Sequence, residues 1–429
     1  MKRLLVGVLV VAGLCLALGA AVWALNLRDE APLPDTTEVN PSTDPAVIAR
    51  GAYLARAGNC MACHTVRGGA EYAGGRAIDT PFGTVYSPNL TPDASTGIGR
   101  WSSAAFWRAM HNGRGRDGRL LYPAFPYTSY TRVTREDSDA LYAYLQSRPA
   151  VPQPNRDHAL RFPYNTQAAL AVWRALYFTP ARFTPDATQT ASWNRGAYLT
   201  QGLAHCSACH SPRDGWGGTD TAREFAGGLM PVQNWYAPAL TSPHEAGVAH
   251  WSPQRIVQLL KTGSAPGASV AGPMAEVVLH STQHLSDADL GAMAAYLQRL
   301  PGAVPVAPAK PVAVAASPLA PLGAKVYEQH CVACHGDAGQ GVPNAYPALA
   351  GNRAVTMANT ANLVQVVLKG GYAPATEGHP RPYGMPPYML VLTDRDVAAV
   401  LTHLRSAWGN QAEAVSELDV NRLRTSASP

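Results

Sequence analysis

Three copies of the pattern Cys-x-x-Cys-His constrain this chain more than any other feature of its sequence. They read "CMACH" at 60–64, "CSACH" at 206–210 and "CVACH" at 331–335. This pattern is typical of c-type haem attachment, because the two thiols add to the porphyrin vinyl groups and the adjacent histidine binds the iron. A zinc site would need a fourth ligand at a recurring spacing, and a redox dithiol would not need histidine in every copy. The sequence therefore predicts three covalently bound haem c groups.

The motifs also define which side chains hold each group. The predicted thioether residues are Cys60, Cys63, Cys206, Cys209, Cys331 and Cys334, and the predicted iron ligands are His64, His210 and His335. A methionine on the opposite face of the iron would raise its potential and exclude substrate, which suits electron transfer. For the second haem, "AGPMAEVV" offers Met274. For the third, "YGMPPYM" offers Met385, with Met389 as the less favoured choice.

The first copy departs from this pattern. Its stretch "LYPAFPYTSY" places Phe125 where a methionine ligand is expected, and phenylalanine has no lone pair to give. Met110 is the alternative ligand, because its counterparts Leu260 and Val367 in the other copies are apolar and should face the haem. Methionine is long and flexible enough to reach the iron. Ligation by His111 and an iron with no sixth ligand remain open.

The motifs belong to three copies of one helical unit. The copies begin "RGAYLARAGNCMACH", "RGAYLTQGLAHCSACH" and "LGAKVYEQHCVACH", and each ends in a helix with acidic residues in its first turn, at 134–149, 285–301 and 392–409. A middle helix precedes the closing one. In the second copy we expect Ser252 to cap it, Pro253 to occupy its first position and Gly263 to end it. Each unit is predicted to be a small helical domain with a loop-rich middle.

An apolar run from Leu4 to Leu25 precedes the units. As a helix it would be roughly 33 Å long, enough to cross a bilayer core of about 30 Å. Lys2 and Arg3 favour a cytoplasmic amino end, and therefore haem domains on the periplasmic side of the inner membrane. A cleaved signal peptide ending near Ala24 is the alternative.

These features divide the chain into segments. The predicted boundaries are a transmembrane anchor at 4–25, a first haem domain at 45–149, a connector at 150–189, a second domain at 190–302, an Ala/Pro-rich linker at 303–321 and a third domain at 322–408. The connector is too aromatic for a free linker and is expected to pack across the first two domains. The residues after Trp408 carry no motif and are expected to be loosely held. The flanking histidines His205 and His330 are expected to be solvated or bonded locally.

The composition excludes other classes of function. The formal charge of +5 comes without a Lys/Arg-rich run, so no nucleic-acid partner is expected. No dinucleotide fingerprint, phosphate-binding loop or His-Glu-x-x-His motif is present. A dehydrogenase active site is therefore expected on another chain.

Taken together, the anchor, the three haem motifs and the stretches "EYAGGRAIDTPFGTVYSPNLTPD", "LYPAFPY" and "GPMAEVV" resemble the triple-haem cytochrome c subunits of bacterial membrane-bound dehydrogenases. The resemblance covers roughly residues 1 to 408. It implies a mainly α fold, with three cytochrome c-like domains in tandem behind an N-terminal transmembrane helix. It also implies an electron-transfer subunit that serves a catalytic partner, which is a quinoprotein, a flavoprotein or a molybdenum hydroxylase, and passes electrons to ubiquinone or a terminal oxidase.

In the alcohol and gluconate type, the stretch around Phe125 is expected to read Tyr-Pro-Ala-Met-Pro-Tyr. Phenylalanine at this position is expected to be commoner in subunits that serve molybdenum hydroxylases, so it favours a partner of that class. Two other functions remain as alternatives: a free-standing membrane-anchored carrier to a terminal oxidase, and a peroxidase-like enzyme with an open haem in the first domain.

Overall fold

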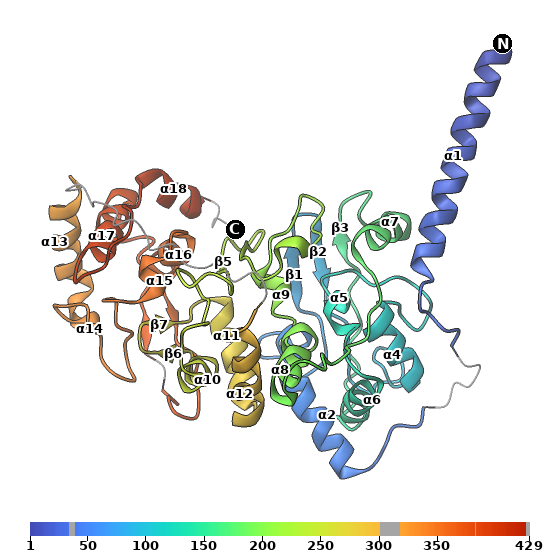
Figure 1. Ribbon diagram of the computed structural model, residues 1–429, viewed down its shortest axis with the longest axis horizontal. Coiled ribbons are helices and arrows are strands. Elements are labelled where there is room, and N and C mark those ends of the chain that lie inside the picture. Colours follow the sequence, from blue (N-terminus) through green and yellow to red (C-terminus); the bar gives the residue numbers. More distant parts are fainter. Residues whose placement is uncertain (34–38, 301–317, 382, 426–429) are drawn as a thin grey trace.

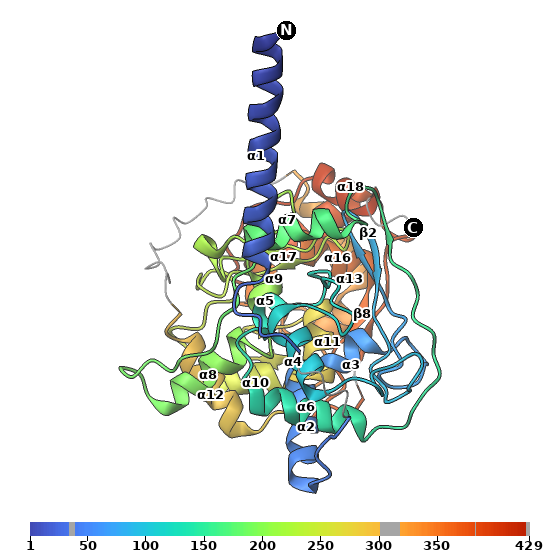
Figure 2. The same ribbon diagram turned by 90° about the vertical axis from the view of Figure 1, so that its right-hand side faces the viewer.

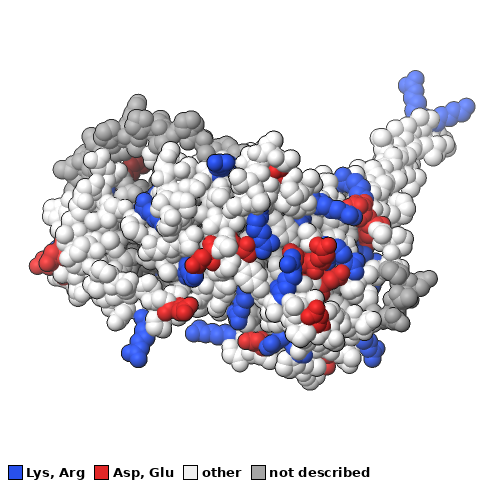
Figure 3. All heavy atoms as spheres, turned by 60° about the horizontal axis from the view of Figure 1, so that its bottom comes forward, with Lys and Arg blue, Asp and Glu red and all other residues white. Residues whose placement is uncertain are grey.

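The computed structural model describes residues 1–33, 39–300, 318–381 and 383–425. A single long helix, α1 (Lys2–Asn26), projects from a helical body (Figures 1 and 2). Its apolar side chains are exposed, and it is the one helix in the described parts of the chain that is long and apolar enough to cross a membrane. Figure 3 shows Lys and Arg only at its far tip, and charges of both signs where it meets the body. The helix extends slightly beyond both ends of the predicted span 4–25.

Three helix pairs form the framework of the body, and each pairs the first helix of one sequence copy with its closing helix. They are α2 (Pro45–Ala57) with α6 (Arg135–Gln146), α8 (Ala191–Gln201) with α12 (Asp287–Leu297), and α13 (Ala320–His330) with α17 (Asp394–Ser406). Each pair crosses at the glycine of the opening motif, Gly51, Gly196 or Gly323. An added Cβ there would lie 1.9, 1.9 and 2.2 Å from a backbone carbonyl oxygen of the closing helix. The repeated glycine therefore allows backbones to touch.

In chain order, a middle helix lies between the two members of each pair: α4 (Ser103–Asn112), α10 (Pro253–Thr262) and α16 (Ala361–Lys369). In α10 the Ser252 side chain accepts a hydrogen bond from the Arg255 amide, Pro253 occupies the first turn, and Gly263 ends the helix at φ 77°. The predicted start and stop of this helix are confirmed. A left-handed glycine at the end frees the last carbonyls to be capped without strain.

Most of the remaining elements are short and lie in the loop-rich middle of each copy, whereas β3 lies in the connector. The short helices are α3 (Cys60–His64), α5 (Tyr127–Tyr130), α9 (Ser207–His210), α11 (Pro273–His280), α14 (Val332–His335) and α15 (Arg353–Thr356), with 3-10 turns at Thr221–Arg223 and Thr282–His284. The strands are β1 (Ala77–Thr80), β2 (Gly83–Tyr86), β3 (Ala159–Leu160), β4 (Gly228–Leu229), β5 (Tyr236–Ala237), β6 (Ser264–Ala265), β7 (Ala268–Ser269), β8 (Gly371–Tyr372) and β9 (Gly384–Met385). β1, β2 and β3 form an antiparallel sheet, and the others form two-stranded pairs.

The first two copies share one hydrophobic core. Leu54 and Leu141 of the first copy belong to the same buried cluster as Leu199 and Leu290 of the second. The third copy has its own cluster, centred on α13, α16 and α17. The first two copies are therefore packed as a unit, whereas the third makes a separate core.

A reciprocal exchange of hydrogen bonds joins the first two copies. Asp137 on α6 is bound by Arg50 of its own copy and by the Tyr198 hydroxyl of the second copy, at 2.5 Å. In return, Asp289 on α12 is bound by Arg195 of its own copy and by the Tyr53 hydroxyl of the first, at 2.6 Å. Arginine and tyrosine come from the "RGAY" of each copy. The third copy reads "LGAK" there and has neither residue, which explains why it stands outside this exchange.

The third copy contacts the second through polar and cation–π interactions. The Arg255 and Arg353 guanidinium carbons lie 3.6 and 4.3 Å from the ring centre of Trp251, one from each copy. Arg353 also donates to the Gly247 carbonyl at 2.7 Å.

The connector between the first two copies is built into the body rather than free. Its strand β3 pairs with β2, in the register Gly83 with Leu160. Its helix α7 (Gln167–Tyr177) packs against α1. Phe183 packs on the core shared by the first two copies and on a further buried cluster of the second copy. Most of the predicted linker 303–321 lies outside the described residues, and α13 already begins at Ala320.

The prediction for the end of the chain is wrong. Residues after Trp408 form α18 (Glu417–Thr425), which packs on α16 and α17. Val420 is fully buried, and the Arg424 guanidinium binds Asp394 of α17 at 2.6 Å. The sequence offered no haem motif there, but Val420, Leu423 and Arg424 dock the short helix on the third copy.

Candidate functional site

The three motif histidines have the same hydrogen-bond partner. Nδ1 of His64, His210 and His335 donates to the carbonyl of Pro88, Pro238 and Pro347 at 2.8, 2.6 and 3.0 Å, respectively. A carbonyl oxygen only accepts, so Nδ1 carries the proton and Nε2 carries the free lone pair. Such a partner fixes the tautomer and ring orientation of a metal ligand. The three prolines fall in the matching stretches "YSPNLT", "YAPALT" and "YPALAG".

Burial favours the neutral form of the three motif histidines. Burial lowers the pKa of His64, His210 and His335, although the proline carbonyl opposes it in each case. A neutral imidazole is the form that binds iron.

Burial also acts on the first cysteine of each motif. It raises the pKa of Cys60 and Cys206 to about 12, and of Cys331 to about 11. A redox dithiol needs a lowered thiol pKa, so the environment disfavours that alternative. A neutral thioether, by contrast, fits an apolar site without cost.

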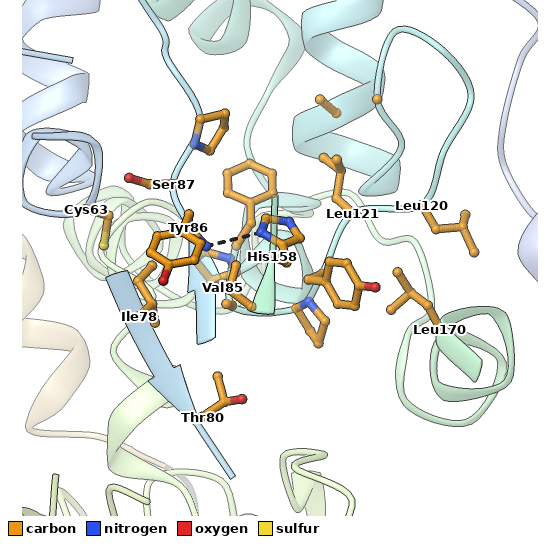
Figure 4. Close-up of a pocket in the computed structure, with 18 of the residues that line it drawn as sticks. Cys63, Ile78, Thr80, Val85, Tyr86, Ser87, Leu120, Leu121, His158 and Leu170 are labelled. Atoms are coloured by element: carbon orange, nitrogen blue, oxygen red, sulfur yellow. Dashed lines mark hydrogen bonds between the residues drawn. The ribbon is translucent and has the colours of Figure 1, made fainter. Parts of the chain in front are cut away.

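A cavity of about 2080 Å³ lies beside the first motif. Cys60, Cys63 and His64 line one side of it, and Met110 and Phe125 also line it. Its other walls are largely apolar. Figure 4 shows Val85 and Tyr86 of β2 and His158 of the connector around it, and places Leu120, Leu121 and Leu170 on the same cavity.

The structure thus places Met110, the proposed ligand, and Phe125, which replaces the expected methionine, on one cavity. Met110 is 6% exposed and belongs to the core shared by the first two copies. The ring of Phe125 lies 5.2 Å from that of Tyr130. His111 does not line this cavity. Its Nδ1 bonds to the Thr131 carbonyl at 2.7 Å, and its ring stacks on Trp107. His111 is thus held outside this cavity by partners of its own, and the choice of sixth ligand for the first haem stays a prediction.

The other candidate methionines occupy different surroundings. Met274 lies in the first turn of α11, directly after Gly272 and Pro273. Met385 lies on β9 and packs against the third core, as does Met389. Their role as iron ligands therefore stays a prediction.

The residues present fit a covalently bound haem c. Each motif offers two thiols and an imidazole with Nε2 free, and the first lies on a large cavity with apolar walls. This is the donor set and the environment that a thioether-linked porphyrin needs.

Two histidines in this region were not identified as site residues from the sequence. His158, on the connector, accepts a hydrogen bond from the Tyr86 amide at 3.1 Å and lines the first cavity (Figure 4). The sequence predicts that His205 is solvated or bonded locally; it is partly exposed, but its surroundings also include the first copy. It lines the cavity of the first copy, with its ring 5.6 Å from that of Tyr130, and burial lowers its pKa. Both contacts join parts distant in sequence, so no local pattern indicated them.

The first two motifs lie close together. Ala208 and Cys209 of the second motif line the cavity of the first. Helix α11, which carries Met274, contacts α3, and Glu276 of α11 pairs with Arg76 of the first copy at 3.3 Å. The packing of the two copies thus brings their attachment sites to a common region.

Comparison with known proteins agrees with this donor set. The cytochrome c family pattern matches residues 48–149 and 320–408. The cytochrome c subunit of the quinone-dependent alcohol dehydrogenase of Gluconacetobacter polyoxogenes is 39% identical over 408 residues, which cover 91% of this chain and 86% of the relative. The gluconate 2-dehydrogenase cytochrome c subunit of Pantoea cypripedii is 38% identical, with coverages of 88% and 90%.

A third relative is longer than this chain. It is a nicotinate dehydrogenase subunit of Pseudomonas putida, 41% identical over 415 residues, which cover 92% of this chain but only 34% of the relative. The similarity therefore extends over nearly the whole of this chain and over one part of that protein.

Proposed function

Because the chain belongs to the family of dehydrogenase cytochrome c subunits, we propose that it carries three haem c groups and transfers electrons from a dehydrogenase partner to ubiquinone or a downstream oxidase. The observation that supports this most directly is the threefold repeat of one ligand geometry, His64, His210 and His335, each bonded to a proline carbonyl. Each bound haem supplies an iron that takes up and releases one electron.

The three haems would occupy three domains, at 45–149, 190–302 and 322–408. In each domain two cysteines hold the group and the histidine presents Nε2 to the iron. Met274 and Met385 would complete the second and third sites. A thioether there excludes water and substrate, so these domains would serve electron transfer only.

For the first domain we propose Met110 as the sixth ligand. It lines the same cavity as Cys60 and His64. His111, the competing nitrogen ligand, is held by Thr131. Phe125 would pack against the bound group without ligating it.

The chain would be held at the inner membrane by α1, with the haem domains in the periplasm. Lys2 and Arg3 at the free end of α1 favour this orientation. The catalytic partner would be a quinoprotein, a flavoprotein or a molybdenum hydroxylase. Phe125 in place of methionine, together with the similarity to a nicotinate dehydrogenase subunit, favours the last class.

One experiment tests the proposal as a whole. The chain is purified from its native membrane in mild detergent, its haem content is measured by pyridine haemochrome, and associated subunits are identified by native mass spectrometry. We expect three haems per chain and a co-purifying dehydrogenase, and no substrate-dependent haem reduction once that subunit is removed. Fewer than three haems in matured protein would contradict the cofactor proposal. A partner-free chain reduced directly by an organic substrate would contradict the electron-transfer role.

A further inference from the structure

The structure points to a second membrane contact beside α1. We propose that the outward face of α7 (Gln167–Tyr177) lies in the interface of the bilayer, next to the point where α1 leaves it. This inference rests on the proposed function in one respect, which is that α1 spans the membrane.

The first observation is the composition of α7. Within this helix, all of which is described, Arg174 is the one charged residue, and it points inward. It is 3% exposed, and it donates to the Asn26 side chain at 2.9 Å and to the Asn112 carbonyl at 2.6 Å. The outward stripe at i, i+4 and i+8 is Ala168, Val172 and Leu176, with Leu176 69% exposed. Val172 and Leu176 also line the cavity of the first copy, whereas Ala168 does not. A surface helix in water normally places polar residues on that face.

The second observation is where α7 lies. The Asn26 side chain of α1 donates to the Ala171 carbonyl at 2.9 Å. Gly19, Val22 and Trp23 of α1 border the same small cleft as Ala168 and Ala171. Figures 1 and 2 both show α7 beside the lower part of α1. The 16 residues from Leu4 to Gly19, beyond this contact, span about 24 Å as a helix. This length covers most of a bilayer core of about 30 Å. The stripe on α7 therefore lies where the hydrocarbon ends.

The third observation is that the joint between α1 and the body is fixed. Glu30, just beyond α1, forms an ion pair with Arg114 at 2.7 Å and lies 3.9 Å from Arg108, and its side chain is only 8% exposed. Arg114 also donates to the Asn26 carbonyl. Since α1 cannot swing freely on the body, its insertion determines which face of the body meets the lipid.

Aromatic and basic side chains around α7 suit the same boundary. Trp23 and Trp216 are 69% and 64% exposed, and the Trp173 indole donates to the Trp216 carbonyl at 3.0 Å. Tryptophan is enriched where hydrocarbon meets headgroups. Phe162 is 82% exposed, and the adjacent Arg161 is also exposed and offers a cation to anionic headgroups. Continuity with the spanning helix favours lipid over a protein partner as the occupant of this face.

The test measures cysteine accessibility in the full-length, haem-loaded chain without its partner, in nanodiscs of phosphatidylethanolamine and phosphatidylglycerol. In a Cys15→Ser background, Leu176→Cys and Ala168→Cys report on α7, and both should be protected. Ala168 does not line the cavity of the first copy, so its protection cannot come from the haem. Ala49→Cys on the exposed side of α2 is the matched control, because α2 lies at the opposite end of the body from α1 (Figures 1 and 2). The six motif cysteines do not react once they are thioethers. We expect a membrane-impermeant maleimide to label position 176 at least tenfold more slowly than position 49, at unchanged haem content.

Native Cys15, in the middle of α1, separates this inference from the function on which it rests. If Cys15 is unreactive in nanodiscs and position 176 reacts as fast as position 49, α1 spans the bilayer and the α7 proposal is wrong. If Cys15 itself reacts, the anchor fails first and the α7 proposal falls with it. Protection of position 176 only after the catalytic subunit is added would assign the stripe to that protein and overturn the lipid contact.

Discussion

Replacing Gly196 by alanine should destabilise the second helical unit, and the size of the loss follows from the crossing of α8 and α12. The new Cβ would lie 1.9 Å from the Ala292 carbonyl oxygen and 3.0 Å from the Met293 amide nitrogen. The obstacle is backbone, so no rotamer change relieves it, and α8 must withdraw by more than about 1 Å from a core that includes fully buried Leu199 and Leu290. Overpacking of this kind costs about 1–3 kcal/mol.

The helix propensity of alanine offsets part of this cost, by about 1 kcal/mol. Because a backbone clash falls at the upper end of the range, we expect a net loss of about 2 kcal/mol. Gly291 provides a matched control on the opposing helix, α12, since an added Cβ there meets nothing within 4 Å. Gly291→Ala should stabilise the protein by about 0.5–1 kcal/mol.

Both variants are compared with wild type by urea unfolding of the haem-loaded protein in detergent, followed by far-ultraviolet circular dichroism. Haem content is measured in parallel. A Gly196→Ala protein at least as stable as Gly291→Ala would refute the claim that this crossing depends on backbone contact.

Three further predictions concern the haem environment and the joint between the first two units. Met110→Leu should remove one of three thioether-to-iron charge-transfer bands from the ferric spectrum while the fold survives, whereas rapid carbon monoxide binding by wild type would argue for an open iron. Tyr198→Phe should cost about 1.5–3 kcal/mol in thermal unfolding, because its partner Asp137 is buried and charged; an unchanged melting temperature would count against the reciprocal exchange. The hydrogen bond from Arg195 lowers the pKa of Asp289, helped by the bond from Tyr53. This stabilisation is therefore present above the unfolded-state pKa of about 3.9 and lost as pH falls through the folded-state pKa. The difference in unfolding free energy between wild type and Asp289→Asn should shrink on acidification. A difference that stays constant from pH 7 to pH 3 would show that Asp289 contributes no acid sensitivity.

Features that depend on neighbours within a few positions could be predicted from the sequence alone. The haem motifs, the apolar span of α1 and the caps at Ser252 and Gly263 all follow from local spacing and local backbone chemistry. The repeat of the three units also appears in the sequence, because each copy carries the same glycine, helix and motif in the same order. Such signals need no knowledge of what lies across the fold.

Which distant residues meet is visible only in the folded chain. Three features join residues from different elements. Met110 and Phe125 line one cavity, and His205 of the second copy lines it too. Tyr198 donates to Asp137 of the first copy, and Tyr53 donates to Asp289 of the second. The docking of α18 and the inward turn of Arg174 on α7 are of the same kind. These contacts could not be predicted because they depend on how helices cross and which faces they bury, and a side chain's spacing along the chain does not specify its partner across the core.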